Sequence, residues 1–164
     1  MTIHRDMFDK KEKPTVMVSG GFDPVHAGHI RMILHASEWG DVIVVANSDR
    51  WLFEKKGFSF MDFEQRAEIL NAIKGVILVD SVDDSDGTVC DAIRRHKPTY
   101  FANGGDRGRD NTPEQALCEE LGVEMLWSIG GDEKRDSSSD LVKRAKKAKK
   151  AIAPHRAKLK HSGR

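Results

Sequence analysis

Two histidines near the start of the chain have a spacing that would let both bind a phosphate group. His26 and His29 lie three residues apart, so they share one face where a helix begins. The glycines Gly20 and Gly21 precede them and let the backbone approach a ligand closely, and Gly28 between them leaves room for one. A helix N-terminus offers free N–H groups and a positive dipole end. The segment therefore predicts a site that grips a phosphate chain while negative charge builds up on it.

Other interpretations of this segment are weaker. An isolated H-x-x-H pair is usually an ordinary surface or capping feature, but this pair follows an apolar strand-like run and a Gly-Gly turn. Zinc would need a fourth ligand near His26, His29 and His35, and the cysteines Cys90 and Cys118 are remote in the sequence. We therefore expect no metal held by protein ligands. The sequence also lacks a P-loop and a G-x-G-x-x-G dinucleotide turn.

The elements that must position the histidines alternate between strands and helices. Apolar runs predict strands over 15–18, 42–46, 76–79, 100–102 and 123–127. Helical spacing or capping signals fill the gaps between them, except that residues 47–60 are expected to be irregular. This alternation predicts an α/β fold with a Rossmann-like, doubly wound, five-stranded parallel sheet and helices on both faces. Such sheets bind ligands at the carboxyl ends of their strands, where the strand order reverses.

Charge divides the chain into a body and a tail. We expect an N-terminal extension over 1–13, one domain over 14–142 and a basic tail over 143–164. The tail holds ten Lys and Arg and no Asp or Glu. Since the whole chain holds 27 basic and 26 acidic residues, residues 1–142 hold 17 against 26, a net charge of −9. We expect the tail to be helical and then disordered.

Three interpretations of the basic tail stay open. In the interpretation we favour, the tail is a solvated chain end. In the second, it is a patch that binds nucleic acid or another anionic surface. In the third, it neutralises the acidic body or a neighbouring subunit. The sequence has no apolar run of membrane-spanning length and no signal-peptide pattern, and its two cysteines are expected to be free thiols. We expect a cytoplasmic protein.

The segment GGFDPVHAGHI, residues 20–30, resembles the G-x-F-D-x-x-H-x-G-H signature of the cytidylyltransferase-like nucleotidyltransferases. The resemblance continues in order through residues 44–57 (VVANSDRWLFEKKG), a helix with Arg66, residues 102–106 (ANGGD) and the serine run 137–139. It covers residues 14–142, almost the whole body.

The resemblance implies a site along one edge of the sheet. His26, His29 and Lys56 would be the catalytic residues, in contact with the phosphates of a nucleoside triphosphate (NTP). The nucleotide-binding residues would be Gly20, Gly21, Phe22, Asp23, Gly28, Arg66, Gly104, Asp106, Ser137, Ser138 and Ser139.

Several of these residues also have simpler interpretations. Lys56 is then a solvated loop charge, Arg66 a charge on an exposed helix face, Asp106 an ordinary turn residue, and the serine run 137–139 only a helix cap. Their shared place in turns and helix starts near one sheet edge favours the site.

The reaction implied by the resemblance is in-line attack of a substrate phosphate on the α-phosphorus of the NTP, with release of pyrophosphate and no covalent enzyme intermediate. It implies Mg²⁺ bound with the NTP, and a homodimer. Residues 47–49 (NSD) and the Gly-Gly-Asp loop look closer to sugar-phosphate adenylyltransferases, such as the heptose 1-phosphate enzymes. Glycerol-phosphate cytidylyltransferases usually carry an arginine where this chain has Asp132.

We therefore expect transfer of AMP or CMP, from ATP or CTP, to a phosphorylated sugar or alcohol. A cytidylyltransferase acting on glycerol phosphate is the alternative within the family. A non-catalytic nucleotide-binding or nucleic-acid-associated protein is the alternative of another class, since one fold serves many functions.

Overall fold

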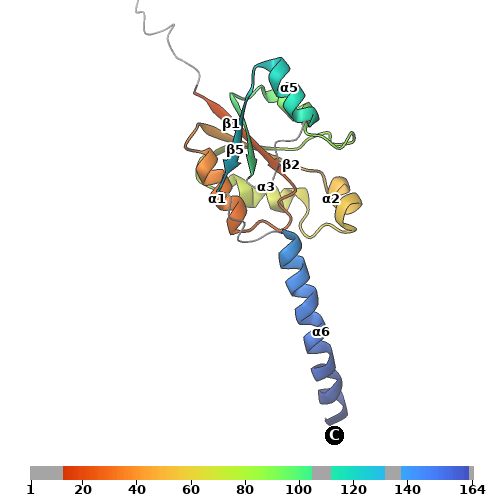
Figure 1. Cartoon of the computed structure of the whole chain (residues 1–164). Helices are drawn as coiled ribbons and strands as arrows, with labels where there is room; N and C mark the ends of the chain where they lie inside the picture. Colours follow the sequence, from red (N-terminus) through yellow and green to blue (C-terminus); the bar gives the residue numbers. More distant parts are fainter. Residues whose placement is uncertain (1–12, 105–111, 132–137, 163–164) are drawn as a thin grey trace, which may run out of the picture.

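The computed structural model describes residues 13–104, 112–131 and 138–162, which form one sheet and six helices (Figure 1). The strands are β1 (Thr15–Gly20), β2 (Asp41–Ala46), β3 (Val76–Asp80), β4 (Tyr100–Gly104) and β5 (Glu124–Ile129). The helices are α1 (Ala27–Ala36), α2 (Asp49–Lys56), α3 (Phe63–Asn71), α4 (Cys90–His96), α5 (Pro113–Leu121) and α6 (Ser138–Ser162).

All five strands run parallel, in the order β3-β2-β1-β4-β5. The chain leaves β1 toward β2 and β3, and later returns to the other side of β1 with β4 and β5. The strand order therefore reverses beside β1, at whose carboxyl end the sequence analysis places the histidines. The predicted Rossmann-like α/β fold is confirmed.

Helices cover both faces of the sheet. Val16 and Val18 of β1 join an apolar cluster with Ile33 of α1 and Leu70 of α3. Met17, between the two valines, joins a second cluster with residues of α4 and α5. Because successive side chains of a strand point to opposite faces, α1 and α3 cover one face and α4 and α5 the other. Burial on both sides explains the continuous apolar runs of the inner strands.

A short helix, α2, replaces part of the irregular segment expected over 47–60. The Ser48 hydroxyl accepts the N–H of Trp51 at 3.0 Å and caps the start of α2, and Gly57 ends it in the left-handed region with φ 84°. Of the eight residues of α2, all of them described, Leu52 alone is buried. The helix therefore lacks the apolar periodicity by which a helix is recognised in a sequence.

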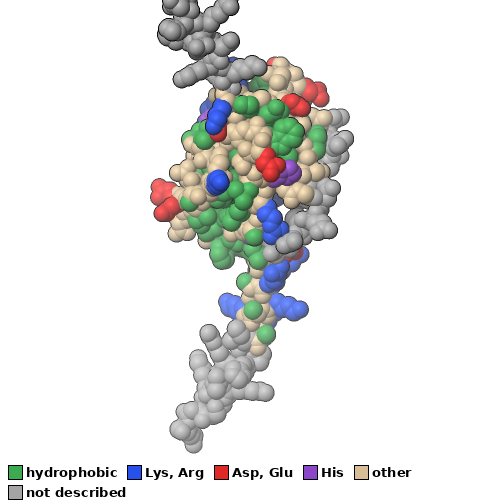
Figure 2. Space-filling model, turned by 90° about the vertical axis from the view of Figure 1, so that its left-hand side faces the viewer, with side chains coloured by type: hydrophobic (Ala, Val, Ile, Leu, Met, Phe, Trp, Pro, Cys, Tyr) green, Lys and Arg blue, Asp and Glu red, His purple; other side chains and the backbone are tan. Residues whose placement is uncertain are grey.

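The last helix, α6, leaves the body of the molecule beside the carboxyl ends of the strands (Figure 1). It continues to Ser162, and the expectation that the end of the tail is disordered stays a prediction. Its sequence over 143–151 consists of Lys, Arg and Ala, which all favour helix. Figure 2 shows Lys and Arg side chains projecting from its described first half. No helix among the described residues is long and apolar enough to cross a bilayer.

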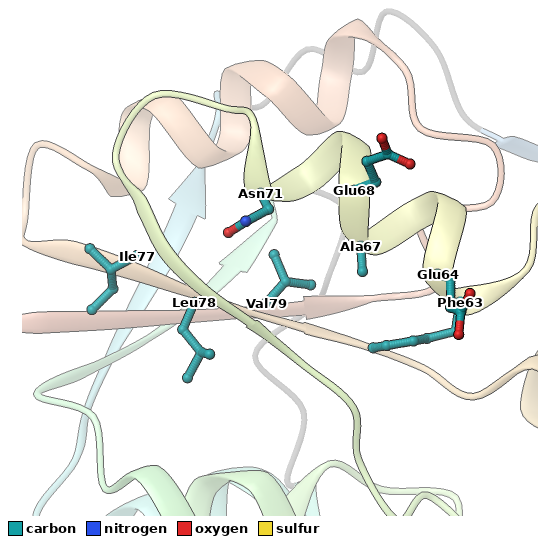
Figure 3. Close-up of a pocket in the computed structure, with 8 residues that line it drawn as sticks. All are labelled: Phe63, Glu64, Ala67, Glu68, Asn71, Ile77, Leu78 and Val79. Atoms are coloured by element: carbon teal, nitrogen blue, oxygen red, sulfur yellow. The ribbon is translucent and has the colours of Figure 1, made fainter.

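A groove of about 540 Å³ lies between α3 and the edge strand β3 (Figure 3). Its lining residues are Phe63, Glu64, Ala67, Glu68, Asn71, Ile77, Leu78 and Val79. None of the residues predicted to bind nucleotide belongs to this lining. Those of the β1–α1 turn lie at the carboxyl edge of the sheet.

Candidate active site

The turn between β1 and α1 runs along the carboxyl edge of the sheet, where the strand order reverses. It contains Phe22 in the left-handed region with φ 51° and a cis Asp23–Pro24 peptide bond. A Cβ atom on Gly21 would lie 2.9 Å from a methyl carbon of Leu52, so a larger residue there would displace the side chain of α2. The absence of a side chain at Gly21 lets the turn pack closely against α2.

The two histidines cap the helix that they begin. His26 is the N-cap of α1, and its Nδ1 accepts the backbone N–H of Gly28 at 3.1 Å. His29 is the third helical residue, and its Nδ1 accepts the backbone N–H of His26 at 3.2 Å. This is a capping box built from two imidazoles, which occupies backbone donors that would otherwise lack partners. The rings stack, with their centroids 3.7 Å apart and an angle of 24° between their planes.

The capping box also decides which ring nitrogens carry protons. A nitrogen that accepts a backbone N–H has no proton of its own, so each neutral ring carries its proton on Nε2. Burial, helped by the nearby His26 and Lys56, lowers the pKa of His29 to about 3. The buried ring of Phe22 contacts the His29 ring edge-on, with centroids 4.9 Å apart. His29 therefore offers a hydrogen-bond donor without a formal charge at neutral pH.

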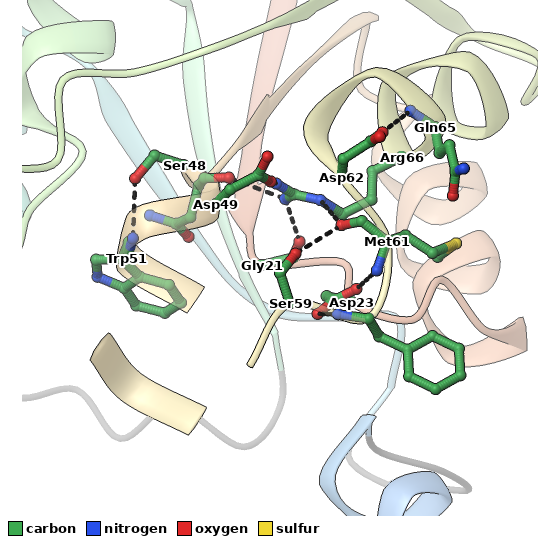
Figure 4. A network of polar contacts seen from close by, with 12 residues as sticks. Gly21, Asp23, Ser48, Asp49, Trp51, Ser59, Met61, Asp62, Gln65 and Arg66 are labelled. Atoms are coloured by element: carbon green, nitrogen blue, oxygen red, sulfur yellow. Dashed lines mark hydrogen bonds and ion pairs between the residues drawn. The ribbon is translucent and has the colours of Figure 1, made fainter. Parts of the chain in front are cut away.

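Asp23 fastens the loop after α2 to the histidine turn. Its carboxylate is 1% exposed and accepts the backbone N–H groups of Phe60 at 2.7 Å and Met61 at 2.6 Å (Figure 4). Its backbone carbonyl accepts a hydrogen bond from Lys56 Nζ at 2.8 Å. Burial lowers the pKa of Lys56 below its usual value, against the opposing effect of Asp23. The structure thus brings Lys56 to the histidine turn, and uses the Asp23 side chain to shape the site.

Arg66 lies beneath the site as a cross-brace. It is fully buried, and its guanidinium donates to the carbonyl oxygens of Gly21 at 2.7 Å, Asn47 at 2.9 Å and Met61 at 3.1 Å. A fourth hydrogen bond, at 2.7 Å, reaches the carboxylate of Asp49 (Figure 4). The interpretation as a charge on an exposed helix face is wrong. The structure also turns the guanidinium toward protein acceptors, so the nucleotide contact expected for Arg66 gives way to a positioning role.

A second cluster at the same edge joins residues 47 and 48 of the NSD segment to Asp84, which the sequence did not predict as a site residue. The carboxylate of Asp84, 4% exposed, accepts hydrogen bonds from Asn47 Nδ2 at 3.1 Å and from the N–H and hydroxyl of Ser48 at 2.9 and 2.7 Å. It joins the loop after β3 to the start of α2. One sequence signal could have indicated this cluster: polar residues follow both β2 and β3, and the carboxyl ends of these strands meet at this edge.

The remaining predicted residues lie at this edge or outside the described residues. Ser138 donates its hydroxyl to the carbonyl oxygen of Pro24 at 3.0 Å, which ties the start of α6 to the histidine turn. Gly20 and Gly104 end β1 and β4, and Ser139 follows Ser138 in the first turn of α6. Asp106 and Ser137 lie outside the described residues.

Replacing Arg66 by lysine tests the cross-brace. A lysine ammonium cannot span the separated acceptors, so buried carbonyl oxygens would lose their donors. We expect Arg66→Lys to lower the free energy of unfolding by about 2–4 kcal/mol, measured by urea denaturation. The matched control, Arg94→Lys on the exposed surface of α4, should change it by less than about 0.5 kcal/mol. Equal stability of the two variants would contradict the role given to Arg66.

The low pKa of His29 predicts a specific pH dependence of stability. The unfolded chain takes up a proton at this residue near pH 6.5, whereas the folded chain resists it down to about pH 3. The unfolded state therefore binds more protons in this window, so stability is lost as the pH falls from 6.5 toward 3. Between pH 7 and 5, the wild type should lose about 1–2 kcal/mol more than His29→Asn, which cannot titrate. Parallel stability curves for the two proteins would rule out the buried neutral imidazole.

Comparison with known proteins places this geometry in a family. Residues 17–144 match the sequence model described as cytidylyltransferase-like. The chain is 38% identical to an FAD synthase from Pyrococcus horikoshii, over 72% of this chain and 75% of that protein. It is 34% identical to the bifunctional protein HldE of Koribacter versatilis over 74% of this chain, but spans only about a quarter (24%) of that relative's length.

A solved structure shows the same fold. The lipopolysaccharide core biosynthesis protein from Thermoplasma volcanium GSS1 superposes with a TM-score of 0.63 at 24% sequence identity, over 76% of this chain and 99% of that one. The resemblance found in the histidine signature is therefore confirmed over most of the body. The chain belongs to the cytidylyltransferase-like family.

Proposed function

We propose that this protein is a nucleotidyltransferase that transfers AMP from ATP, or CMP from CTP, to a phosphorylated sugar or alcohol and releases pyrophosphate. The observation that carries the proposal is the capping box of His26 and His29. It presents imidazole donors at the start of a helix, at the sheet edge where ligands of this fold bind.

The reaction needs alignment and charge stabilisation more than covalent chemistry. An oxygen of the acceptor phosphate attacks the α-phosphorus, and the bond to the bridging oxygen breaks, so that pyrophosphate leaves with the bonding electrons. Negative charge on the transferring phosphoryl group is stabilised by the Nε2–H donors and by Lys56, whose ammonium lies against the same turn. Mg²⁺ would be bound with the triphosphate, where it would neutralise part of the phosphate charge. Alignment of two bound reactants supplies roughly 7–11 kcal/mol of the barrier reduction.

The relatives support the choice of substrates. FAD contains an adenylyl group, so the FAD synthase relative favours ATP as the donor. The HldE relative favours a sugar phosphate as the acceptor. The FAD synthase match also makes flavin mononucleotide a specific second candidate acceptor. The homodimer and the Mg²⁺ requirement stay predictions.

A substrate panel tests the proposal directly. The full chain would be incubated with Mg²⁺, each of the four common NTPs, and sugar 1-phosphates, glycerol 3-phosphate or flavin mononucleotide, with pyrophosphate release as the readout. We expect the highest rate with ATP and a sugar phosphate. Highest rates with CTP and glycerol 3-phosphate would instead support the cytidylyltransferase alternative. Absence of pyrophosphate with every pair would favour a non-catalytic nucleotide-binding protein.

Substitution of the histidines tests the mechanism. Removing one preorganised donor typically lowers turnover by about 10²–10³-fold, and we expect at least this loss for His26→Ala and for His29→Ala. The control is His96→Ala on α4, whose ring pairs with Asp80 and belongs to no part of the site. Circular dichroism would verify that the variants fold. Wild-type turnover in both histidine variants would exclude the proposed role.

A further inference from the structure

The first half of α6 carries a dense run of positive charge, which we name the basic segment. It consists of residues 143–150, and its six charged residues are Lys143, Arg144, Lys146, Lys147, Lys149 and Lys150. All six are exposed on a helix that leads away from the body (Figures 1 and 2). We infer that the basic segment binds nucleic acid through its phosphate backbone. This inference does not depend on the proposed transferase activity.

The spacing of charge matches that of a nucleic acid. Eight helical residues span about 12 Å, so six cations give one charge per roughly 2 Å of helix axis. Double-stranded DNA carries one negative charge per about 1.7 Å of its axis. The densest acidic run of the body, residues 80–86, holds four Asp. Asp80 of this run pairs with Arg95 and Asp84 is buried, so the run offers a neighbouring copy less accessible charge than its composition suggests. A linear polyanion is therefore the best electrostatic match for this segment.

The arrangement of charge around the helix argues against a membrane surface. At 3.6 residues per turn, the six cations occupy an arc of about 220°. The remaining arc of the segment holds only Ala145 and Ala148. Helices that lie in a membrane surface bury an opposite face of large apolar residues, and this segment has none. A wide basic arc instead suits phosphates that approach from more than one side of the helix.

The base of α6 is attached to the body. The Ser138 hydroxyl donates to the carbonyl oxygen of Pro24, and the Lys146 ammonium lies 6.0 Å from the centre of the Phe58 ring. Bound nucleic acid would therefore lie beside the candidate active site. This neighbourhood also defines a competing role, in which the lysines attract the NTP instead.

Fluorescence anisotropy with a labelled 20-base-pair DNA duplex, and separately a 20-nucleotide RNA, tests the inference on the full chain. We expect micromolar binding at 50 mM NaCl that weakens by about 10²-fold at 200 mM, the salt dependence of roughly four phosphate contacts. Lys147→Glu/Lys150→Glu should weaken binding at least tenfold at 50 mM and lower the salt slope by about two. The control, Lys74→Glu/Arg94→Glu, makes the same change in net charge on the exposed body and should leave the affinity within about threefold.

Four outcomes would overturn the inference. An equal loss of binding in both double variants would show that nucleic-acid binding depends on net charge alone. No binding to either nucleic acid, but binding to vesicles with 30% phosphatidylserine, would assign the segment to membranes. A tenfold rise in KM for ATP in Lys147→Glu/Lys150→Glu, without nucleic-acid binding, would assign it to the NTP. Self-association that salt and the same variant abolish, seen by sedimentation without nucleic-acid binding, would assign it to the acidic body of a second copy.

Discussion

The guanidinium of Arg66 reaches the carbonyl oxygens that follow β1 and β2, at Gly21 and Asn47, and that of Met61 in the loop before α3. Parallel strands that end at one edge leave such carbonyl groups without sheet partners, and where they are buried they need donors from the protein. The planar guanidinium group of arginine carries five N–H donors, so it can bind several acceptors at once. The free energy cost of burying this charge is offset only while all these partners are present. The positions of the histidine turn, α2 and the loop before α3 therefore depend on one another.

Burial explains why the His29 imidazole is neutral. Desolvation lowers the pKa of His29 most, and the nearby His26 and Lys56 would in addition repel a further cation there. The capping box removes that possibility by occupying Nδ1 of each histidine with a backbone N–H. A neutral donor held in place still stabilises charge that develops in a transition state, because it requires no reorganisation. The same two hydrogen bonds thus start the helix and fix the donors.

The sequence predicted the fold well because the inner strands are apolar runs, and because α3 and α5 begin at recognisable signals, the N-cap Asp62 and the first-turn Pro113. It also located the histidine turn, since glycines and histidines in that order have few structural uses. It failed for Arg66 and Asp84 for a common reason. Whether a charged side chain faces solvent or a polar partner depends on which loops meet. Gly21 and Asn47 are 45 and 19 residues distant from Arg66. The partners of Asp84 are 36 to 37 residues distant from it. For α2, eight mostly polar residues gave no periodic signal, and only Ser48 and Gly57 marked its ends.

The distribution of charge then has a physical consequence for a polyphosphate ligand. A body with a net charge of −9 repels anions, but salt screens this repulsion beyond about 8 Å at physiological ionic strength. Under the proposed function, attraction at the site must therefore come from groups in direct contact with the ligand, namely the imidazole Nε2–H donors and Lys56, since the backbone N–H groups of His26 and Gly28 are occupied by the capping box. Such contacts depend on geometry and are strong only where Asp23 and Arg66 hold the turn in place. On the two proposals, positive groups in this chain act in two ways: a few oriented donors recognise the ligand at the sheet edge, and a dense run of exposed basic residues on α6 attracts a polyanion through charge density.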